Sequence, residues 1–267
     1  SIVSLRRRSR VFASLRTAIR ANDVERAREF FADRKADSDE PPSWMLRHAC
    51  RNGYIGIARV LLAHGADVHG SDQRGITSLE LACYYDHLEC ARLCLVYGAA
   101  VDHKNINGYT ALLIACQEGN DECAELCLEF GADIHLANNN GYSPLHITCK
   151  KGQVGCLNLL LARGASLDVV NRYGKAPLHV ACKGGFAEAV VALLEGGDNI
   201  NRSTVDGDLE SSYEGGLPLH IACGAGRRKV VLTLIERGAN PYLKDRYGKT
   251  AFEYANARAD SNRKRVI

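Results

Sequence analysis

The sequence predicts an all-α solenoid in which one pair of short helices is copied and stacked. Residues 138–172 show a complete copy, whose pattern indicates a turn, a short helix, a second helix and a hairpin. A cysteine ends the first helix of successive copies every 33 residues, at Cys50, Cys83, Cys116, Cys149 and Cys182. A leucine recurs on each first helix, and a glycine follows each second helix. A fixed period of this size indicates one supersecondary unit that buries its apolar face against its neighbours.

Two recurring motifs resemble those of a known family. Boxes of the form x-Pro-Leu-His occur at 143–146, 176–179 and 217–220, and Gly-Ala-Asp segments open 65–69 and 131–135. They resemble the TPLH box and the GADVN segment of ankyrin repeats, and the resemblance covers residues 13–260. It implies an ankyrin-repeat solenoid of stacked helix pairs with β-hairpin tips, which is used for protein binding.

The repeats are expected to form one domain over 13–267, with about eight copies of the unit, after a basic flank at 1–12. Residues 13–40 are predicted to be a degenerate N-terminal cap, because Leu15–Ile19 resembles Leu46–Cys50 at a distance of 31 residues. Complete repeats are predicted at 41–71, 72–104, 105–137, 138–170, 171–203 and 215–244. Residues 245–267 are predicted to cap the C-terminal end, with a basic second helix that begins at Arg258.

An insertion interrupts the period after Cys182. The next cysteine of the series, Cys223, follows after 41 residues instead of 33, so eight residues are added, and we place the insertion at 204–214. The segment is acidic, and Asp206-Gly207-Asp208 resembles part of a calcium loop, but the spacing of the remaining ligands is wrong for one. Two roles stay open, a mobile extension of a hairpin and an additional contact with a partner.

The eleven cysteines occupy only three positions of the repeat, which indicates structural rather than chemical use. Free cysteine packs as a small apolar side chain and is among the most buried residue types. No Cys-x-x-Cys motif and no cysteine–histidine pair has the spacing of a zinc site. We therefore expect core thiols, no metal or other cofactor, and a reducing compartment.

Charge and hydropathy bear on three questions: whether the chain spans a membrane, whether it binds nucleic acid, and which cellular compartment it occupies. No run approaches about 18 apolar residues, so no membrane-spanning helix is predicted. A net charge of +3 does not by itself indicate nucleic acid. Six arginines and no acid in the first 20 residues indicate either a plain basic flank or the remnant of an organelle transit peptide. The cytoplasm is the expected compartment, and a mitochondrion or another organelle is the alternative.

The chain shows no pattern of catalytic residues. It has no G-x-S-x-G, no glycine-rich phosphate loop with lysine and no H-E-x-x-H, so neither enzymatic activity nor a small-molecule substrate is predicted. His146, His179 and His220 recur at one repeat position, and the resemblance implies that each bonds backbone and a neighbouring turn. Earlier repeats carry Glu80 and Leu113 there, so we expect those repeats to be tied less tightly.

Function is therefore expected on a surface, the concave face that the hairpin tips and exposed first-helix ends form in ankyrin repeats. Tyrosine recurs at these tips and is a frequent interface anchor. The later tips are basic, which indicates either a solvated basic face or a docking surface for a protein partner with an acidic surface. The predicted binding residues are Arg74, Tyr84, Tyr85, Tyr109, Tyr142, Lys150, Lys151, Arg172, Tyr173, Lys175, Lys183, Arg246, Tyr247 and Lys249.

Three functional readings remain open. The first is a non-catalytic scaffold, either a freestanding adaptor or an accessory subunit of a larger assembly. The second is the targeting or regulatory module of a longer enzyme. The third is nucleic-acid binding through the basic face, which steep salt dependence with random DNA or RNA would favour.

Overall fold

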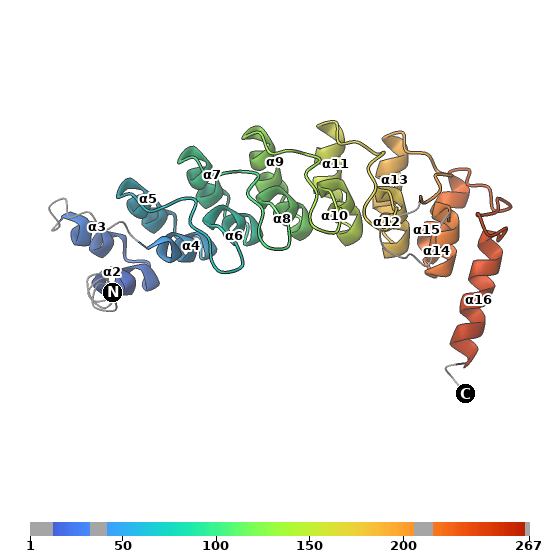
Figure 1. Cartoon of the computed structure of the whole chain (residues 1–267), viewed down its shortest axis with the longest axis horizontal. Coiled ribbons are helices and arrows are strands. Elements are labelled where there is room, and N and C mark those ends of the chain that lie inside the picture. Colours follow the sequence, from blue (N-terminus) through green and yellow to red (C-terminus); the bar gives the residue numbers. More distant parts are fainter. Residues whose placement is uncertain (1–12, 33–41, 206–215, 265–267) are drawn as a thin grey trace. The chain divides into compact units, whose positions relative to one another are not determined.

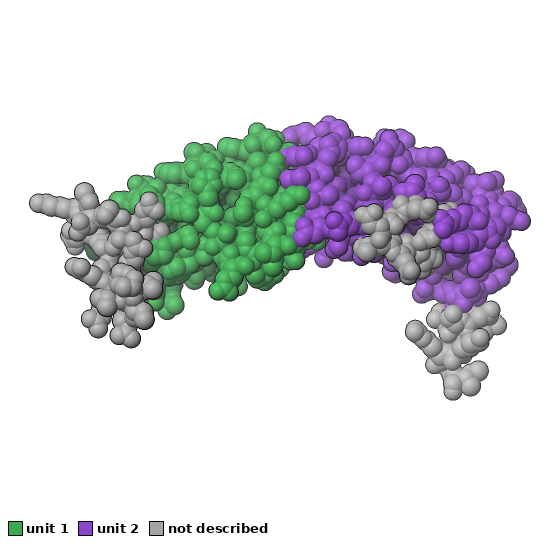
Figure 2. Space-filling view, viewed as in Figure 1, with its two compact units in different colours: residues 1–115, 122–132 green, residues 116–121, 133–267 purple. Residues whose placement is uncertain are grey.

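The computed structural model describes residues 13–32, 42–205 and 216–264, which form fifteen helices and no β-sheet (Figure 1). The chain divides into two compact units, unit 1 with residues 1–115 and 122–132 and unit 2 with residues 116–121 and 133–267 (Figure 2). The boundary falls within the pair α8 (Ala111–Glu118) and α9 (Asp121–Glu129). The repeat boundaries expected from the sequence, and their grouping in one domain, stay predictions.

Unit 1 is built from helix pairs that stack in two layers. The helices are α2 (Ala13–Arg20), α3 (Val24–Ala32), α4 (Ser43–Arg51), α5 (Ile55–Ala63), α6 (Ser78–Tyr84) and α7 (Leu88–Val96), followed by most of α8 and α9. The first helices α2, α4 and α6 pack on one another in order, and so do the second helices α3, α5 and α7. Each helix buries one face; α4, for example, buries Met45, Leu46, Ala49 and Cys50.

Unit 2 repeats the same arrangement. The helices are α10 (Pro144–Lys151), α11 (Val154–Ala162), α12 (Pro177–Gly184), α13 (Ala187–Glu195), α14 (Pro218–Gly224), α15 (Arg228–Glu236) and α16 (Ala251–Lys264). The first helices α10, α12 and α14 pack in order and α16 follows them, while α11, α13 and α15 form the second layer. Proline stands in the first turn of α10, α12 and α14, where its missing N–H costs no intrahelical hydrogen bond.

The cysteines lie in the core, as predicted. Ten of the eleven are buried, Cys223 is partly buried, and all are free thiols. Burial raises the pKa of the Cys149 and Cys182 thiols far above the ordinary value, because a thiolate loses its hydration there. These thiols are therefore neutral apolar packing groups.

The C-terminal helix differs from the prediction that a second helix begins at Arg258. One continuous helix, α16, runs from Ala251 to Lys264. In earlier pairs the turn between the helices carries a residue with positive φ three positions after the repeated cysteine, such as Gly119, Gly152 and Gly226. Ala259 takes that position here. Alanine strongly favours helix over the left-handed conformation, so the helix continues.

The tips between repeats are tight turns rather than pairs of strands. Within the described part of the chain the only bridge of β type links Lys244 to Thr250. Such a turn is closed by the side chain of an asparagine or aspartate instead of by paired strands. In one case, Oδ1 of Asn138 accepts hydrogen bonds from the backbone N–H groups of Asn140 and Tyr142. The same pattern begins at Asp72, Asn105, Asn171 and Asp245. These turns fix the side chains that face the ends of the first helices.

Candidate protein-binding grooves

Histidines tie the first helices of unit 2 to the neighbouring tips. Nδ1 of His146 accepts the N–H of Ser143 at 3.3 Å, and Nε2 of His146 lies 2.9 Å from the carbonyl oxygen of Lys175. Because Nδ1 accepts, the proton is on Nε2, which donates to that carbonyl. His179 and His220 repeat the arrangement with the carbonyls of Arg202 and Lys249. The predicted structural role of these histidines is confirmed.

In unit 1 the equivalent position holds Glu80. Its side chain is buried, and Oε2 accepts a hydrogen bond from Nδ2 of Asn105 at 3.0 Å, while Oε1 has no hydrogen-bond partner among the described residues. Burial raises the pKa of Glu80 to about 7, against the lowering effect of the Asn105 hydrogen bond. The carboxyl therefore changes charge near neutral pH.

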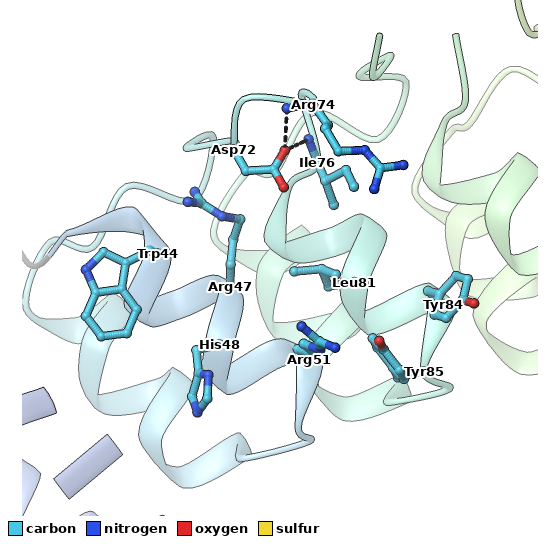
Figure 3. A pocket seen from close by; sticks show the side chains of 10 residues that line it. All are labelled: Trp44, Arg47, His48, Arg51, Asp72, Arg74, Ile76, Leu81, Tyr84 and Tyr85. Atoms are coloured by element: carbon cyan, nitrogen blue, oxygen red, sulfur yellow. Dashed lines mark hydrogen bonds between the residues drawn. The ribbon is translucent and has the colours of Figure 1, made fainter. Parts of the chain in front are cut away.

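Groove 1 is an open cavity of about 560 Å³ in unit 1 (Figure 3). Trp44 and His48 lie at one side, and Tyr84 and Tyr85 at the other, with Arg51 and Leu81 between them. The full lining is Trp44, Arg47, His48, Arg51, Asp72, Arg74, Ile76, Leu81, Tyr84 and Tyr85. The groove thus combines three guanidinium groups with aromatic and aliphatic surface.

Two of the arginines in groove 1 are positioned by neighbours. Nη1 of Arg47 donates to Oγ of Ser43 at 3.0 Å, and the guanidinium carbon of Arg51 lies 5.5 Å from the centroid of the Tyr85 ring.

Partial burial, with the charges of Arg20 and Arg51, lowers the pKa of His48, so this ring is neutral at neutral pH. The carboxylate of Asp72 holds the tip through the N–H groups of Arg74 and Ile76.

Groove 2 is an open cavity of about 450 Å³ in unit 2. The Tyr142 and Tyr173 rings lie side by side with centroids 6.4 Å apart, and Nζ of Lys150 lies 4.7 Å from the Tyr142 centroid. The full lining is Tyr142, Lys150, Tyr173, Lys175, Val180, Lys183, Gly184 and Arg227. Four of these side chains are cationic and none is acidic.

Lys175 is buried at the base of groove 2, with only 6% of its surface exposed. Burial, with a smaller contribution from Lys183, lowers the pKa of Lys175 to about 8. Its backbone is fixed on both sides, because its N–H donates to Asn171 and its carbonyl accepts from His146. Lys175 therefore supplies positive charge from below the surface, whereas Lys150 and Lys183 are exposed.

The two grooves occupy the same place in the repeat, three periods apart. Arg51 of groove 1 stands where groove 2 has Lys150, and Leu81 stands where groove 2 has Val180. The chemistry differs at the four other shared positions. Groove 1 has Tyr84, Tyr85, Ile76 and Arg74 where groove 2 has Lys183, Gly184, Lys175 and Tyr173. Groove 1 is thus aromatic and arginine-based, and groove 2 is lysine-based.

Eight of the fourteen predicted binding residues line a groove. Arg74, Tyr84 and Tyr85 line groove 1, and Tyr142, Lys150, Tyr173, Lys175 and Lys183 line groove 2. The other six lie outside both linings: Tyr109, Lys151, Arg172, Arg246, Tyr247 and Lys249. Tyr109 is half-buried and the remaining five are exposed. Their part in binding stays a prediction.

Sequence reasoning missed Trp44, Arg47 and Arg51 in groove 1 and Arg227 in groove 2. Arg51 could have been found, because it takes the same repeat position as Tyr84, Lys150 and Lys183. Arg227 reaches groove 2 because its Nε donates to the carbonyl oxygen of Lys183 at 2.9 Å. The equivalent contact occurs two repeats earlier, where Nε2 of Gln153 donates to the carbonyl oxygen of Gln117 at 3.2 Å.

The family model for ankyrin repeats (3 copies) matches overlapping stretches at 15–105, 46–138, 79–171, 126–204 and 156–245. This chain belongs to the ankyrin-repeat family. Among solved structures it is similar to the human ASB11 ankyrin repeat domain, with a TM-score of 0.67 and 30% sequence identity over 79% of this chain and 90% of that one. No curated protein sequence matches the chain.

The predicted ankyrin solenoid is thereby confirmed. Ankyrin repeats are generally modules for protein–protein interaction and typically carry no catalytic activity of their own. None of the helices in the described ranges is long and apolar enough to cross a membrane.

Proposed function

We propose that this ankyrin-repeat chain is a non-catalytic protein-binding module and that groove 2 docks an acidic segment of a partner protein. The observation that carries the proposal is the lining of groove 2, where four cations surround two tyrosine rings without a carboxylate. The module acts as an adaptor or as an accessory subunit of a larger assembly. Its free thiols favour a reducing compartment, with the cytoplasm as the first candidate.

The two residue types in groove 2 have separate roles in this proposal. Lys150 and Lys183 are exposed, so they attract an acidic partner over a distance and raise the association rate, an effect that salt screens. Tyr142 and Tyr173 are half-buried and present ring surface that a partner covers. A covered tyrosine at the centre of an interface acts mainly on dissociation.

The test measures binding of a fluorescein-labelled peptide of ten glutamates to the intact chain. Replacing Lys150 and Lys183 by Glu should weaken binding at least about tenfold, with most of the loss in the association rate. The matched control replaces Arg228 and Lys229, two exposed cations on the second helix α15, by Glu and makes the same change in net charge. An equal loss in the control would show that net charge, and not groove 2, binds the peptide.

A labelled oligothymidylate of equal charge distinguishes the nucleic-acid reading. The proposal predicts that the peptide binds more tightly than the oligonucleotide, because the groove offers cationic side chains and two tyrosine rings but no row of stacking surfaces. Tighter binding of the oligonucleotide, with a steep salt dependence, would replace the protein partner with nucleic acid.

A further inference from the structure

Groove 1 takes the same position in the repeat as groove 2, but an aromatic and an aliphatic residue stand in place of two of the three lysines. Tyr84 and Tyr85 replace Lys183 and Gly184, and their side chains are 46% and 39% exposed. Ile76 replaces the buried Lys175. A ligand of groove 1 therefore meets substantial apolar surface, which a purely acidic segment cannot use.

The positive charge of groove 1 is carried by guanidinium groups that are spread along it. Arg47 and Arg51 lie one turn apart on α4, and Arg74 projects from the tip between α5 and α6 (Figure 3). Among the described residues, no carboxylate lies within ion-pair distance of these three groups. Guanidinium binds carboxylate through two parallel hydrogen bonds and is weakly hydrated, so it suits a site that also buries apolar surface.

We propose that groove 1 is a second, separate binding site for an extended peptide segment in which acidic residues flank a bulky apolar side chain. The apolar side chain lies against Ile76 and Leu81 between the rings of Trp44 and Tyr84, and the flanking carboxylates pair with Arg51 and Arg74. Tryptophan, tyrosine and arginine are the residue types enriched among binding hot spots, and all three line this groove.

The geometry favours a peptide over a phosphate-rich ligand. A single phosphate needs donors that converge on one point, whereas the arginines stand apart along the groove (Figure 3). Asp72 adds a carboxylate to the lining, so the groove is not uniformly positive, as a site for a continuous polyanion such as single-stranded nucleic acid would be. The proposal concerns unit 1 alone, so a negative result for groove 2 would not contradict it.

Trp44 provides a direct readout, because it is the only tryptophan in the chain and it lines groove 1. The test follows Trp44 fluorescence of the intact protein during titration with the peptide Ac-EEELEEE-amide. A saturable change is expected. Two peptide controls replace the glutamates by glutamine or the leucine by serine, and each should bind at least about tenfold more weakly.

Protein variants locate the site. Replacing both Arg51 and Arg74 by Ala should weaken the peptide at least about tenfold, whereas replacing Arg59 and Arg92, exposed arginines on α5 and α7, should leave Kd unchanged. Tyr84→Ala should weaken it as well, mainly through faster dissociation. The change of Lys150 and Lys183 to Glu should have no effect on the Trp44 signal.

Several results would overturn the proposal. They are the lack of a saturable Trp44 response, equal binding of the glutamine peptide, and equal loss in the Arg59 and Arg92 control. If oligothymidylate displaces the peptide at a concentration below the Kd of the peptide, groove 1 is a nucleic-acid site. If inorganic phosphate displaces it in the micromolar range, groove 1 is a phosphate site.

Discussion

Nε2 of His146 donates a 2.9 Å hydrogen bond to the carbonyl oxygen of Lys175, so the first helix of one repeat holds the tip of the next. The ring is neutral in this arrangement, because Nδ1 accepts the Ser143 N–H. Protonation would remove that acceptor, whereas Nε2 would still donate to the carbonyl of Lys175. Burial lowers the pKa of His146 to about 4, and the same cause lowers the pKa of His179 to about 4. The hydrogen bond between Ser143 and His146 at the start of α10 therefore depends on pH.

Unit 2 should lose stability as the pH falls from about 6.5, the ordinary value for histidine, to about 4. Between these values the unfolded chain binds more protons than the folded chain, so the free energy of unfolding rises with pH there. Each of the two histidines lowers the free energy of unfolding by about 3 kcal/mol once the pH has fallen from about 6.5 to about 4. Hydrogen exchange of α10 and α12 at pH 7 and pH 4.5 measures it, after correction for intrinsic exchange rates. Equal protection at both values would contradict the prediction.

Unit 1 should respond in the opposite direction through Glu80. Its folded pKa of about 7 lies above the unfolded value of about 4.5, so the folded chain holds the proton more tightly. The stabilising effect is complete below pH 4.5 and is lost as the pH rises through 7. Hydrogen exchange of α6 should therefore be slower at pH 6 than at pH 8, after the same correction.

Glu80→Gln tests the cause, because glutamine keeps the shape of the protonated acid and does not titrate. The difference in α6 protection between pH 6 and pH 8 should disappear in this variant. Glu89→Gln on α7 is the matched control, since Glu89 is exposed and should leave the difference intact. A pH dependence that survives in the Glu80 variant would assign it to another group.

Adjacent tips are linked through a glycine that tolerates no side chain. The Arg172 N–H donates to the carbonyl oxygen of Asn140, and a Cβ added at Gly141 would lie 2.9 Å from the Arg172 nitrogen. Gly141→Ala should therefore destabilise unit 2 by more than Gly164→Ala. Both glycines have φ near +80°, but a Cβ at Gly164 meets nothing within 4 Å.

The difference between these two glycine variants isolates the contact from the backbone strain that both share. We expect Gly164→Ala to cost about 1 kcal/mol and Gly141→Ala at least about 1 kcal/mol more, since a backbone atom must shift. Urea unfolding followed by circular dichroism gives both values. Equal midpoints would mean that the tips rearrange freely and are not coupled through this contact.

The repeated parts of the fold could be predicted from the sequence because they depend on local signals. The cysteine period located the first helices, and the x-Pro-Leu-His boxes predicted both the helix starts and the histidine contacts. The features that the sequence did not predict are those that arise only between repeats. Lys175 carries a charge that predicts exposure, yet it packs below two tyrosine-bearing tips.

The candidate grooves were only partly predictable for the same reason. Arg51 shares a repeat position with the predicted residues Lys150 and Lys183, so alignment of the repeats alone would have included it. Trp44 and Arg47 have no counterpart of similar chemistry in the next repeat, where Thr77 and Glu80 take those positions. Their place in groove 1 follows from the packing of α4 beside α6.

The insertion lies within a tip, and its described ends show how the tip is closed. Thr204 takes the position of Asn138 and Asn171: its N–H donates to the Gly216 carbonyl at 3.0 Å, and its Oγ1 accepts the Gly216 N–H at 3.1 Å. Val205 then donates to the carbonyl of Gly174, one position further along the tip than the equivalent of Asn140, to which Arg172 donates in the previous pair. The remainder of the predicted insertion, from 206 onward, lies outside the described residues.

Two deletions of this segment should therefore behave differently. Removing Gly207–Glu214 leaves a five-residue tip, Thr204-Val205-Asp206-Gly215-Gly216, with glycine in the fourth place as at Gly141 and Gly174. This variant should keep the free energy of unfolding of unit 2 within about 1 kcal/mol, because loop length has a weak entropic cost. Removing Thr204–Glu214 also takes away the buried Thr204 and both bonds to Gly216. That variant should lose at least about 2 kcal/mol more, because buried backbone groups lose their partners. Urea unfolding of both variants, with hydrogen exchange of α12 and α14, measures the difference. Equal destabilisation by the two deletions would show that the removed residues themselves, and not the Thr204–Gly216 closure, support the neighbouring repeats.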